Sequence, residues 1–164
     1  FARPMSSSEF GEDALSFNRC RFATRLPTNR IYTRSHYWLR EVEPGLWRVG
    51  FTAYGTRLLG EIVEYEFEVQ PGWAVGAGQK IGWVEGFKTL SDLYSVATGE
   101  FVGDNAALRG DITLLDSDPY ERGWLYQVRG HPEPAAVDPH AYAAVLNAAI
   151  DMVLEGRVLD DSHE

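Results

Sequence analysis

The chain has 164 residues, 45% of them hydrophobic, which is the length and composition of one ordinary domain with short extensions. Twenty-four Asp and Glu residues against 15 Lys and Arg residues give a formal net charge of −9, which argues against nucleic acid or an anionic membrane as a partner. No apolar stretch approaches the roughly 20 residues that cross a bilayer, so we expect neither a membrane span nor a secretory signal. A single cysteine, Cys20, excludes an internal disulfide, so we expect a cytoplasmic protein.

Short strands are the dominant pattern of the chain. Residues 1–29 carry scattered charges and no periodic apolar face, which indicates a partly disordered N-terminal extension. The clearest strand is 61–69, where Val63, Tyr65, Phe67 and Val69 alternate with glutamates, so one face should be buried and the other wet. Frequent turns without βαβ spacing predict an antiparallel sandwich or flattened barrel. The other strand candidates are 46–52, 80–84, 93–96, 99–102 and 124–129.

The C-terminal region changes to a helical period. Asp138 is a suitable N-cap, Pro139 suits the first helical position, and apolar residues recur at helical spacing from Tyr142 to Val153. Gly156 is the expected C-cap. The apolar stripe should pack on the strands or, alternatively, in a groove of a partner. The predicted division is an extension at 1–29, a domain at 30–130, a linker and helix packing on that domain at 131–156, and an acidic tail at 157–164.

Familiar catalytic patterns are absent from the sequence. The Gly76–Gly78 pair lacks the third glycine of a dinucleotide loop, and neither a phosphate-binding GxxxxGK[ST] loop nor a GxSxG motif occurs. The four histidines are scattered without ligand spacing, so no histidine-based metal site is expected. Arginines clustered between Arg19 and Arg40 offer, as an alternative, a local basic face for an acidic partner. The sequence therefore favours a protein that is not an enzyme.

Lysine is rare in this chain. Only Lys80 and Lys88 are lysines, whereas the other basic residues are arginines, and a guanidinium is effectively never an acylation target at neutral pH. Lys88 falls between two strand candidates, close to Gly86, Ser91 and Asp92, and should project from a hairpin tip. An exposed loop lysine is usually just a solubilising residue. The isolation of Lys88 among arginines instead favours a functional role that requires an amine at this position.

Four segments, in this order, resemble landmarks of the glycine cleavage system H protein family. They are 32–39 (YTRSHYWL), 49–52 with 59–63 (VGFT and LGEIV), 84–94 (VEGFKTLSDLY) and 118–125 (DPYERGWL). The resemblance covers about residues 30–155, including a helix after the last strand. It implies a mostly β barrel-sandwich hybrid with antiparallel sheets and a C-terminal amphipathic helix.

The resemblance implies a lipoyl carrier. Lys88 would be acylated by lipoate, Glu85 and Gly99 match positions at which the lipoylating enzyme recognises the tip, and Asp92 is an acid that supports it. The arm would take an aminomethyl group from glycine decarboxylase, deliver it to the aminomethyltransferase and be reoxidised by dihydrolipoyl dehydrogenase. The carrier itself would contribute effective concentration rather than catalysis.

Two positions depart from the family pattern. Tyr37 stands where the family usually has Glu, and Leu58 where plant-type members have His. An aminomethylated arm would be held less well by Tyr and Leu, because burying its amine without a polar partner is costly. A less polar groove leaves open an H-like lipoate-binding paralogue that carries sulfur intermediates in heterodisulfide-reductase-like sulfur oxidation. An unmodified β-sandwich interaction module is a further alternative. A biotin or acyl carrier fits less well, because Phe87 and Thr89 flank the lysine where those domains have other residues.

Overall fold

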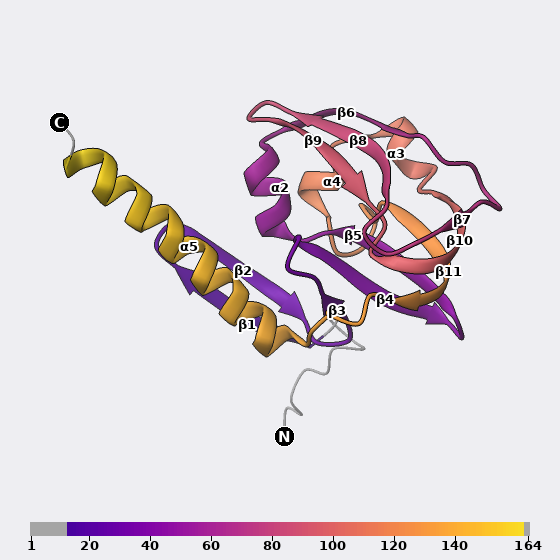
Figure 1. Ribbon diagram of the computed structural model, residues 1–164, viewed down its shortest axis with the longest axis horizontal. Coiled ribbons are helices and arrows are strands. Elements are labelled where there is room, and N and C mark those ends of the chain that lie inside the picture. The colour runs from indigo at the N-terminus through magenta and orange to yellow at the C-terminus, as the bar shows by residue number, and fades with distance from the viewer. Residues whose placement is uncertain (1–12, 163–164) are drawn as a thin grey trace, which may run out of the picture.

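A computed structural model describes residues 13–162 of the chain (Figure 1). The strands are β1 (Ala14–Arg19), β2 (Phe22–Pro27), β3 (Ile31–Tyr32), β4 (Tyr37–Glu43), β5 (Leu46–Phe51), β6 (Ile62–Phe67), β7 (Ala74–Val75), β8 (Lys80–Gly86), β9 (Leu90–Tyr94), β10 (Ala97–Asp104) and β11 (Tyr126–Pro132). The helices are α2 (Ala53–Leu59), α3 (Ala107–Gly110), α4 (Leu114–Ser117) and α5 (Pro139–Ser162). Within the described residues, none of the helices is long and apolar enough to cross a membrane.

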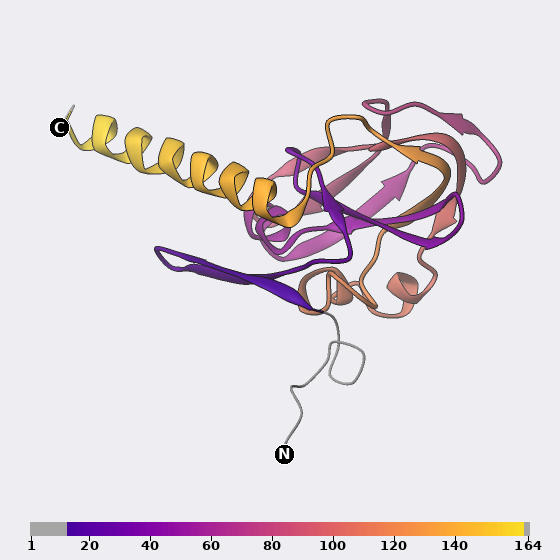
Figure 2. The same cartoon turned by 90° about the horizontal axis from the view of Figure 1, so that it is seen from below.

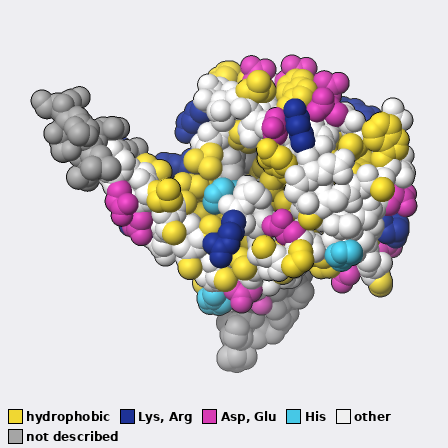
Figure 3. All heavy atoms as spheres, viewed as in Figure 1, with side chains coloured by type: hydrophobic (Ala, Val, Ile, Leu, Met, Phe, Trp, Pro, Cys, Tyr) yellow, Lys and Arg dark blue, Asp and Glu magenta, His cyan; other side chains and the backbone are white. Residues whose placement is uncertain are grey.

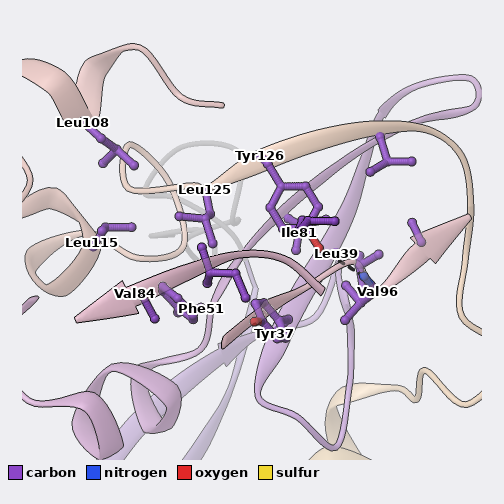
Figure 4. Packing of buried hydrophobic residues seen from close by; sticks show 14 of the residues in the cluster. Tyr37, Leu39, Phe51, Ile81, Val84, Val96, Leu108, Leu115, Leu125 and Tyr126 are labelled. Atoms are coloured by element: carbon purple, nitrogen blue, oxygen red, sulfur yellow. Dashed lines mark hydrogen bonds between the residues drawn. The ribbon is translucent and has the colours of Figure 1, made fainter. Parts of the chain in front are cut away.

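Two antiparallel sheets enclose the main core. One sheet has the order β3-β4-β5-β11-β10-β7 and the other the order β6-β8-β9. Apolar side chains from both sheets point toward one another between them (Figure 4), and Leu39, Ile81 and Tyr126 are fully buried there. This burial removes apolar surface from water, which is the main force that holds the two sheets together. The predicted mostly β barrel-sandwich hybrid with a C-terminal helix is confirmed.

The predicted strands have the right positions along the chain, but the burial of one residue differs from the prediction. The runs 46–52 and 61–69 correspond to β5 and β6, and the glutamates of the second run are exposed as predicted. Acidic and hydrophobic side chains are interspersed along the edge of the molecule where β6 lies, at the top of Figure 3. A bulge between Ile62 and Glu64 breaks the alternation, and Val63 is 47% exposed, so its predicted burial is wrong.

A β-hairpin forms where the sequence indicated only an extension. Strands β1 and β2 pair antiparallel through a two-residue turn at Cys20 and Arg21. Cys20 has a φ of 55°, in the left-handed region that such tight turns require. Phe17, Phe22 and Leu26 of this hairpin are buried. The prediction of an irregular segment is therefore wrong for residues 14–27, and the rest of the predicted extension, 1–12, lies outside the described residues.

The C-terminal helix α5 begins as predicted and packs on this hairpin. Asp138 accepts a hydrogen bond from the Ala141 amide at 2.8 Å, which is an N-cap bond. Tyr142 and Leu146 are fully buried in a second core that includes hairpin residues. Figures 1 and 2 show that the hairpin and α5 both extend away from the barrel. The helix then runs through Gly156 to Ser162, so the predicted cap and the start of a non-helical tail there are wrong.

Polar contacts join the tip of the hairpin to α5. The Arg19 guanidinium donates to the Asn147 backbone carbonyl at 2.9 Å and forms an ion pair with Asp151. Exposed ion pairs add little to stability, so the buried aromatic side chains supply most of the stability of this contact. The hairpin and the helix share this second core with Tyr32, Trp38 and Tyr54 of the main domain, so the start of α5 also packs on that domain as predicted.

Candidate functional site

Lys88 lies at the tip of the β8–β9 hairpin, in the loop 87–89, as the sequence predicted. The Gly86 amide donates to the Thr89 carbonyl at 2.9 Å and closes the loop. The Lys88 side chain is exposed, and its Nζ donates to the backbone carbonyl of Arg57 at 2.9 Å. Arg57 belongs to α2, which lies directly beneath this hairpin tip (Figure 1).

The C-terminal end of α2 supports the lysine loop. Thr52 caps the helix by accepting from the Gly55 amide at 3.2 Å, and the chain leaves the helix at Gly60 with a φ of 77°. The Lys88 amide then donates to the Leu59 carbonyl at 3.0 Å. A Cβ on Gly86 would lie 2.1 Å from the same carbonyl oxygen, so only glycine permits this approach. The position of Lys88 is therefore fixed by the backbone of two elements.

The two lysines of the chain have different surroundings. Lys80 lies in β8, where its Nζ is 3.4 Å from an Asp92 carboxylate oxygen and 3.8 Å from Glu68. Of the residues that the structure describes, no acidic side chain lies within ion-pair distance of Lys88. The Lys88 amine is consequently the more accessible of the two for a reaction at the hairpin tip.

Three of the four site residues expected from the sequence share one hairpin. Glu85 is exposed in β8 next to the loop, and Asp92 is exposed in β9. Gly99 lies on β10, in the other sheet, and does not join Lys88 on that hairpin. A Cβ at Gly99 would lie 2.0 Å from the Arg129 carbonyl oxygen, so strand packing by itself requires glycine at this position.

A groove of about 250 Å³ runs along the hairpin and one face of α2. Among the described residues that line it, Asp92 is the only acid, and none is lysine or arginine. Tyr37 and Leu58 form apolar parts of its wall. The Tyr37 hydroxyl accepts from the Tyr94 amide at 3.2 Å, and burial raises the pKa of Tyr37 to about 12, so this phenol is neutral at neutral pH. The groove therefore has one carboxylate, Asp92, which also forms an ion pair with Lys80 outside the groove lining.

His36 connects this groove to the C-terminal helix. It lines the groove with a φ of 71°, and its Nδ1 lies 2.8 Å from the Tyr142 hydroxyl of α5. That hydroxyl is also hydrogen-bonded to the Thr52 hydroxyl at 2.7 Å. Burial lowers the pKa of His36 from 6.5 to about 4, so the imidazole is neutral at neutral pH.

We predict that His36 makes the fold sensitive to acid. Because the pKa is about 4 in the folded state and 6.5 when unperturbed, its contribution is complete above pH 6.5 and is lost as the pH falls toward 4. The loss approaches about 3 kcal/mol for the full shift. The measurement is urea unfolding from about pH 7 to about pH 4 for the wild type and His36→Asn, since Asn tolerates this φ and does not titrate. Equal pH dependence in both proteins would contradict the assignment.

A barrel-sandwich hybrid that presents one accessible lysine on a hairpin tip has the form of a carrier domain. A family model described as glycine cleavage H-protein matches residues 30–144. The chain belongs to the glycine cleavage H-protein family. The hairpin β1–β2 and most of α5 lie outside the matched residues.

Individual relatives agree with this membership. The chain is 36% identical over 126 residues to the glycine cleavage system H protein of Enterobacter sp. (strain 638), which covers 75% of this chain and 97% of that protein. It is 41% identical over 110 residues to the H protein of Thermobifida fusca (strain YX), with 67% and 86% covered. The crystal structure of the Mycobacterium marinum H protein has a TM-score of 0.66 and 34% identity, with 73% and 97% covered.

Proposed function

We propose that this protein is a lipoyl carrier of the glycine cleavage system, with lipoate in amide linkage to Lys88. Proteins of this family bear lipoate and are non-catalytic components of the system. The observation that supports the site is the accessible Lys88 amine, whose partner is a backbone carbonyl, whereas Lys80 faces two carboxylates. When bound, the lipoyl group would supply a dithiol that carries the aminomethyl cargo.

The residues around Lys88 suit the tasks of a carrier. The loop backbone holds the point of attachment on α2, while the exposed side chain leaves the arm free to reach other proteins. Asp92 in the groove can pair with an ammonium, and the Tyr37 and Leu58 side chains limit access of water. Tethering raises the effective concentration of the cargo at each partner. The proposed partners are glycine decarboxylase, aminomethyltransferase, dihydrolipoyl dehydrogenase and the lipoylating enzyme.

The test has two stages on the full chain. Intact-mass spectrometry with peptide mapping, after co-expression with a lipoate ligase and lipoate, is expected to show one lipoyl group on the Lys88 peptide. The lipoylated protein should then support exchange of labelled bicarbonate with glycine by glycine decarboxylase. An unmodified chain beside an active ligase would favour the interaction module. A lipoylated chain without exchange would exclude the glycine cleavage role.

The groove supports one alternative cargo. Tyr37 is neutral and its hydroxyl is engaged with backbone, and Leu58 is 46% exposed, so Asp92 alone offers charge to an amine. An arm that carries sulfur intermediates for a heterodisulfide-reductase-like system needs fewer polar side chains in the groove. Lipoylation at Lys88 combined with failure of the glycine exchange is the result that would favour this second candidate.

The proposed compartment is the cytoplasm. Cys20 is a free and exposed thiol. Exposed thiols persist in reducing compartments and tend to oxidise elsewhere. Fractionation of the cells that produce the protein would test the location directly.

Glu85 is predicted to act in recognition by the lipoylating enzyme. Glu85→Gln should slow ligase-catalysed lipoylation about tenfold, because a charge beside the reacting amine steers the encounter. Its stability should change by less than about 0.5 kcal/mol, since the side chain is exposed. Glu64→Gln is the matched control, because Glu64 pairs with Glu85 across β6 and β8 and is also exposed. Similar lipoylation rates in both variants would contradict a specific role for Glu85.

A further inference from the structure

The β1–β2 hairpin builds a second hollow beside Lys88. This trough is shallow and open to solvent, with a volume of about 680 Å³. Its walls come from β2, from α2 and from the lysine itself. Because β1 and β2 lie outside the residues matched by the family model, the trough depends on elements that the family model does not include.

The trough and the groove lie on opposite faces of α2. Ala53, Thr56 and Arg57 line the trough, whereas Gly55, Leu58 and Leu59 line the groove. At 3.6 residues per turn, these two sets point in nearly opposite directions from the helix axis. An arm attached above the end of α2 can therefore turn to either side.

The Lys88 side chain already turns to the trough side. Lys88 lines the trough, and its Nζ donates to the Arg57 carbonyl, whereas the groove is lined by its neighbour Thr89 instead. Acylation converts the amine to an amide, which keeps one N–H donor. The same carbonyl can accept from that N–H, so the attached chain would start in the trough.

The charged side chains that line the two hollows differ. Arg21 and Arg57 line the trough together with one acid, Asp116, whose carboxylate accepts from the Ile62 amide at 3.3 Å. The guanidinium of Arg57 lies over the Phe22 ring, 5.5 Å from its centre. Two guanidinium groups disfavour an ammonium, whereas the described lining of the groove has no basic side chain and holds Asp92, which is 3.4 Å from the Lys80 amine. An uncharged arm is therefore better suited to the trough and an amine-bearing arm to the groove.

We propose that the uncharged lipoyl arm on Lys88 rests in this trough, against Ala23 of the hairpin and Ala53 of α2. The inference rests on the proposed lipoylation of Lys88. Its methylene chain and disulfide would cover apolar surface that the hairpin and α2 provide. The hairpin thereby acts as a resting place for the empty arm, while α5 holds it in position through the buried contacts and the ion pair of Arg19 with Asp151.

Methyl NMR spectra of the unmodified and the lipoylated full chain test the position of the arm. The Ala23 and Ala53 methyl resonances are expected to shift on lipoylation, whereas those of Leu58 in the groove and Ala107 on α3 should not. Shifts at Leu58 alone would place the arm in the groove, and no shifts would place it in solvent; either result overturns the proposal. A mass spectrum of the same sample separates this from failure of lipoylation, which would instead contradict the proposed function.

The reduction rate of the lipoyl disulfide by a water-soluble phosphine gives a second readout. An arm that rests in the trough for about four-fifths of the time reacts about fivefold more slowly than a free arm. Ala23→Trp should fill the trough and raise the rate about fivefold. Arg25→Trp is the control, because Arg25 is exposed on the same strand and does not line the trough. Equal rates in wild type and both variants, each fully lipoylated and folded, would overturn the proposal.

Discussion

Lys88→Arg is expected to abolish lipoylation and all carrier activity while the protein folds normally. The guanidinium keeps the positive charge and can donate to the Arg57 carbonyl, but it is not acylated at neutral pH. Because the side chain is exposed at a loop tip, the free energy of unfolding should change by less than about 0.5 kcal/mol. Intact mass after co-expression with the ligase, and glycine–bicarbonate exchange, measure the two losses.

Lys80→Arg is the matched control for this experiment. Lys80 lies on the same hairpin, and an arginine there can keep the ion pairs with Asp92 and Glu68. This variant should be lipoylated as fully as the wild type. A lipoyl group found on Lys80, or turnover by the Lys88→Arg protein, would show that the site has been assigned to the wrong residue.

Local patterns predicted an antiparallel sandwich or flattened barrel and the lysine loop, whereas the barrel-sandwich hybrid was implied by the family resemblance. Alternating residues and glycine or proline turns mark β5, β6 and β8 without knowledge of their partners. The helix α2 was missed, although Thr52 and Gly60 are an N-cap and a C-terminal glycine, because seven residues are too few to show a helical period. The sequence therefore did not predict that α2 supports the Lys88 loop.

The N-terminal hairpin could not be predicted for a different reason. Its turn, Cys20–Arg21, has none of the Asn-Gly or Asp-Gly signals of a tight hairpin. Its buried residues Phe17 and Phe22 pack on α5, more than a hundred residues away in sequence. A two-stranded hairpin alone is only marginally stable, so its existence depends on that distant helix. The hairpin forms one wall of the trough beside Lys88, so the trough could not be predicted from the sequence for the same reason.

The packing around Gly99 gives the second large predicted effect. Gly99 has a φ of 152°, pairs with Gly130 across β10 and β11, and leaves no room for a Cβ beside the Arg129 carbonyl. Gly99→Ala must separate two central strands or move the carbonyl. Overpacking against backbone combined with an unfavourable φ should cost about 3 kcal/mol or more.

Gly103→Ala separates the steric cost from the cost of the backbone angle. Gly103 lies on the same strand with a φ of 148°, but its nearest atom to a new Cβ is Pro71 Cγ at 4.0 Å. Urea unfolding should show Gly99→Ala less stable than Gly103→Ala by about 2 kcal/mol. Once folded, Gly99→Ala should be lipoylated at the wild-type rate, because Gly99 is not on the lysine hairpin. Normal stability with slow lipoylation would instead assign Gly99 to recognition by the lipoylating enzyme, as the family resemblance implies.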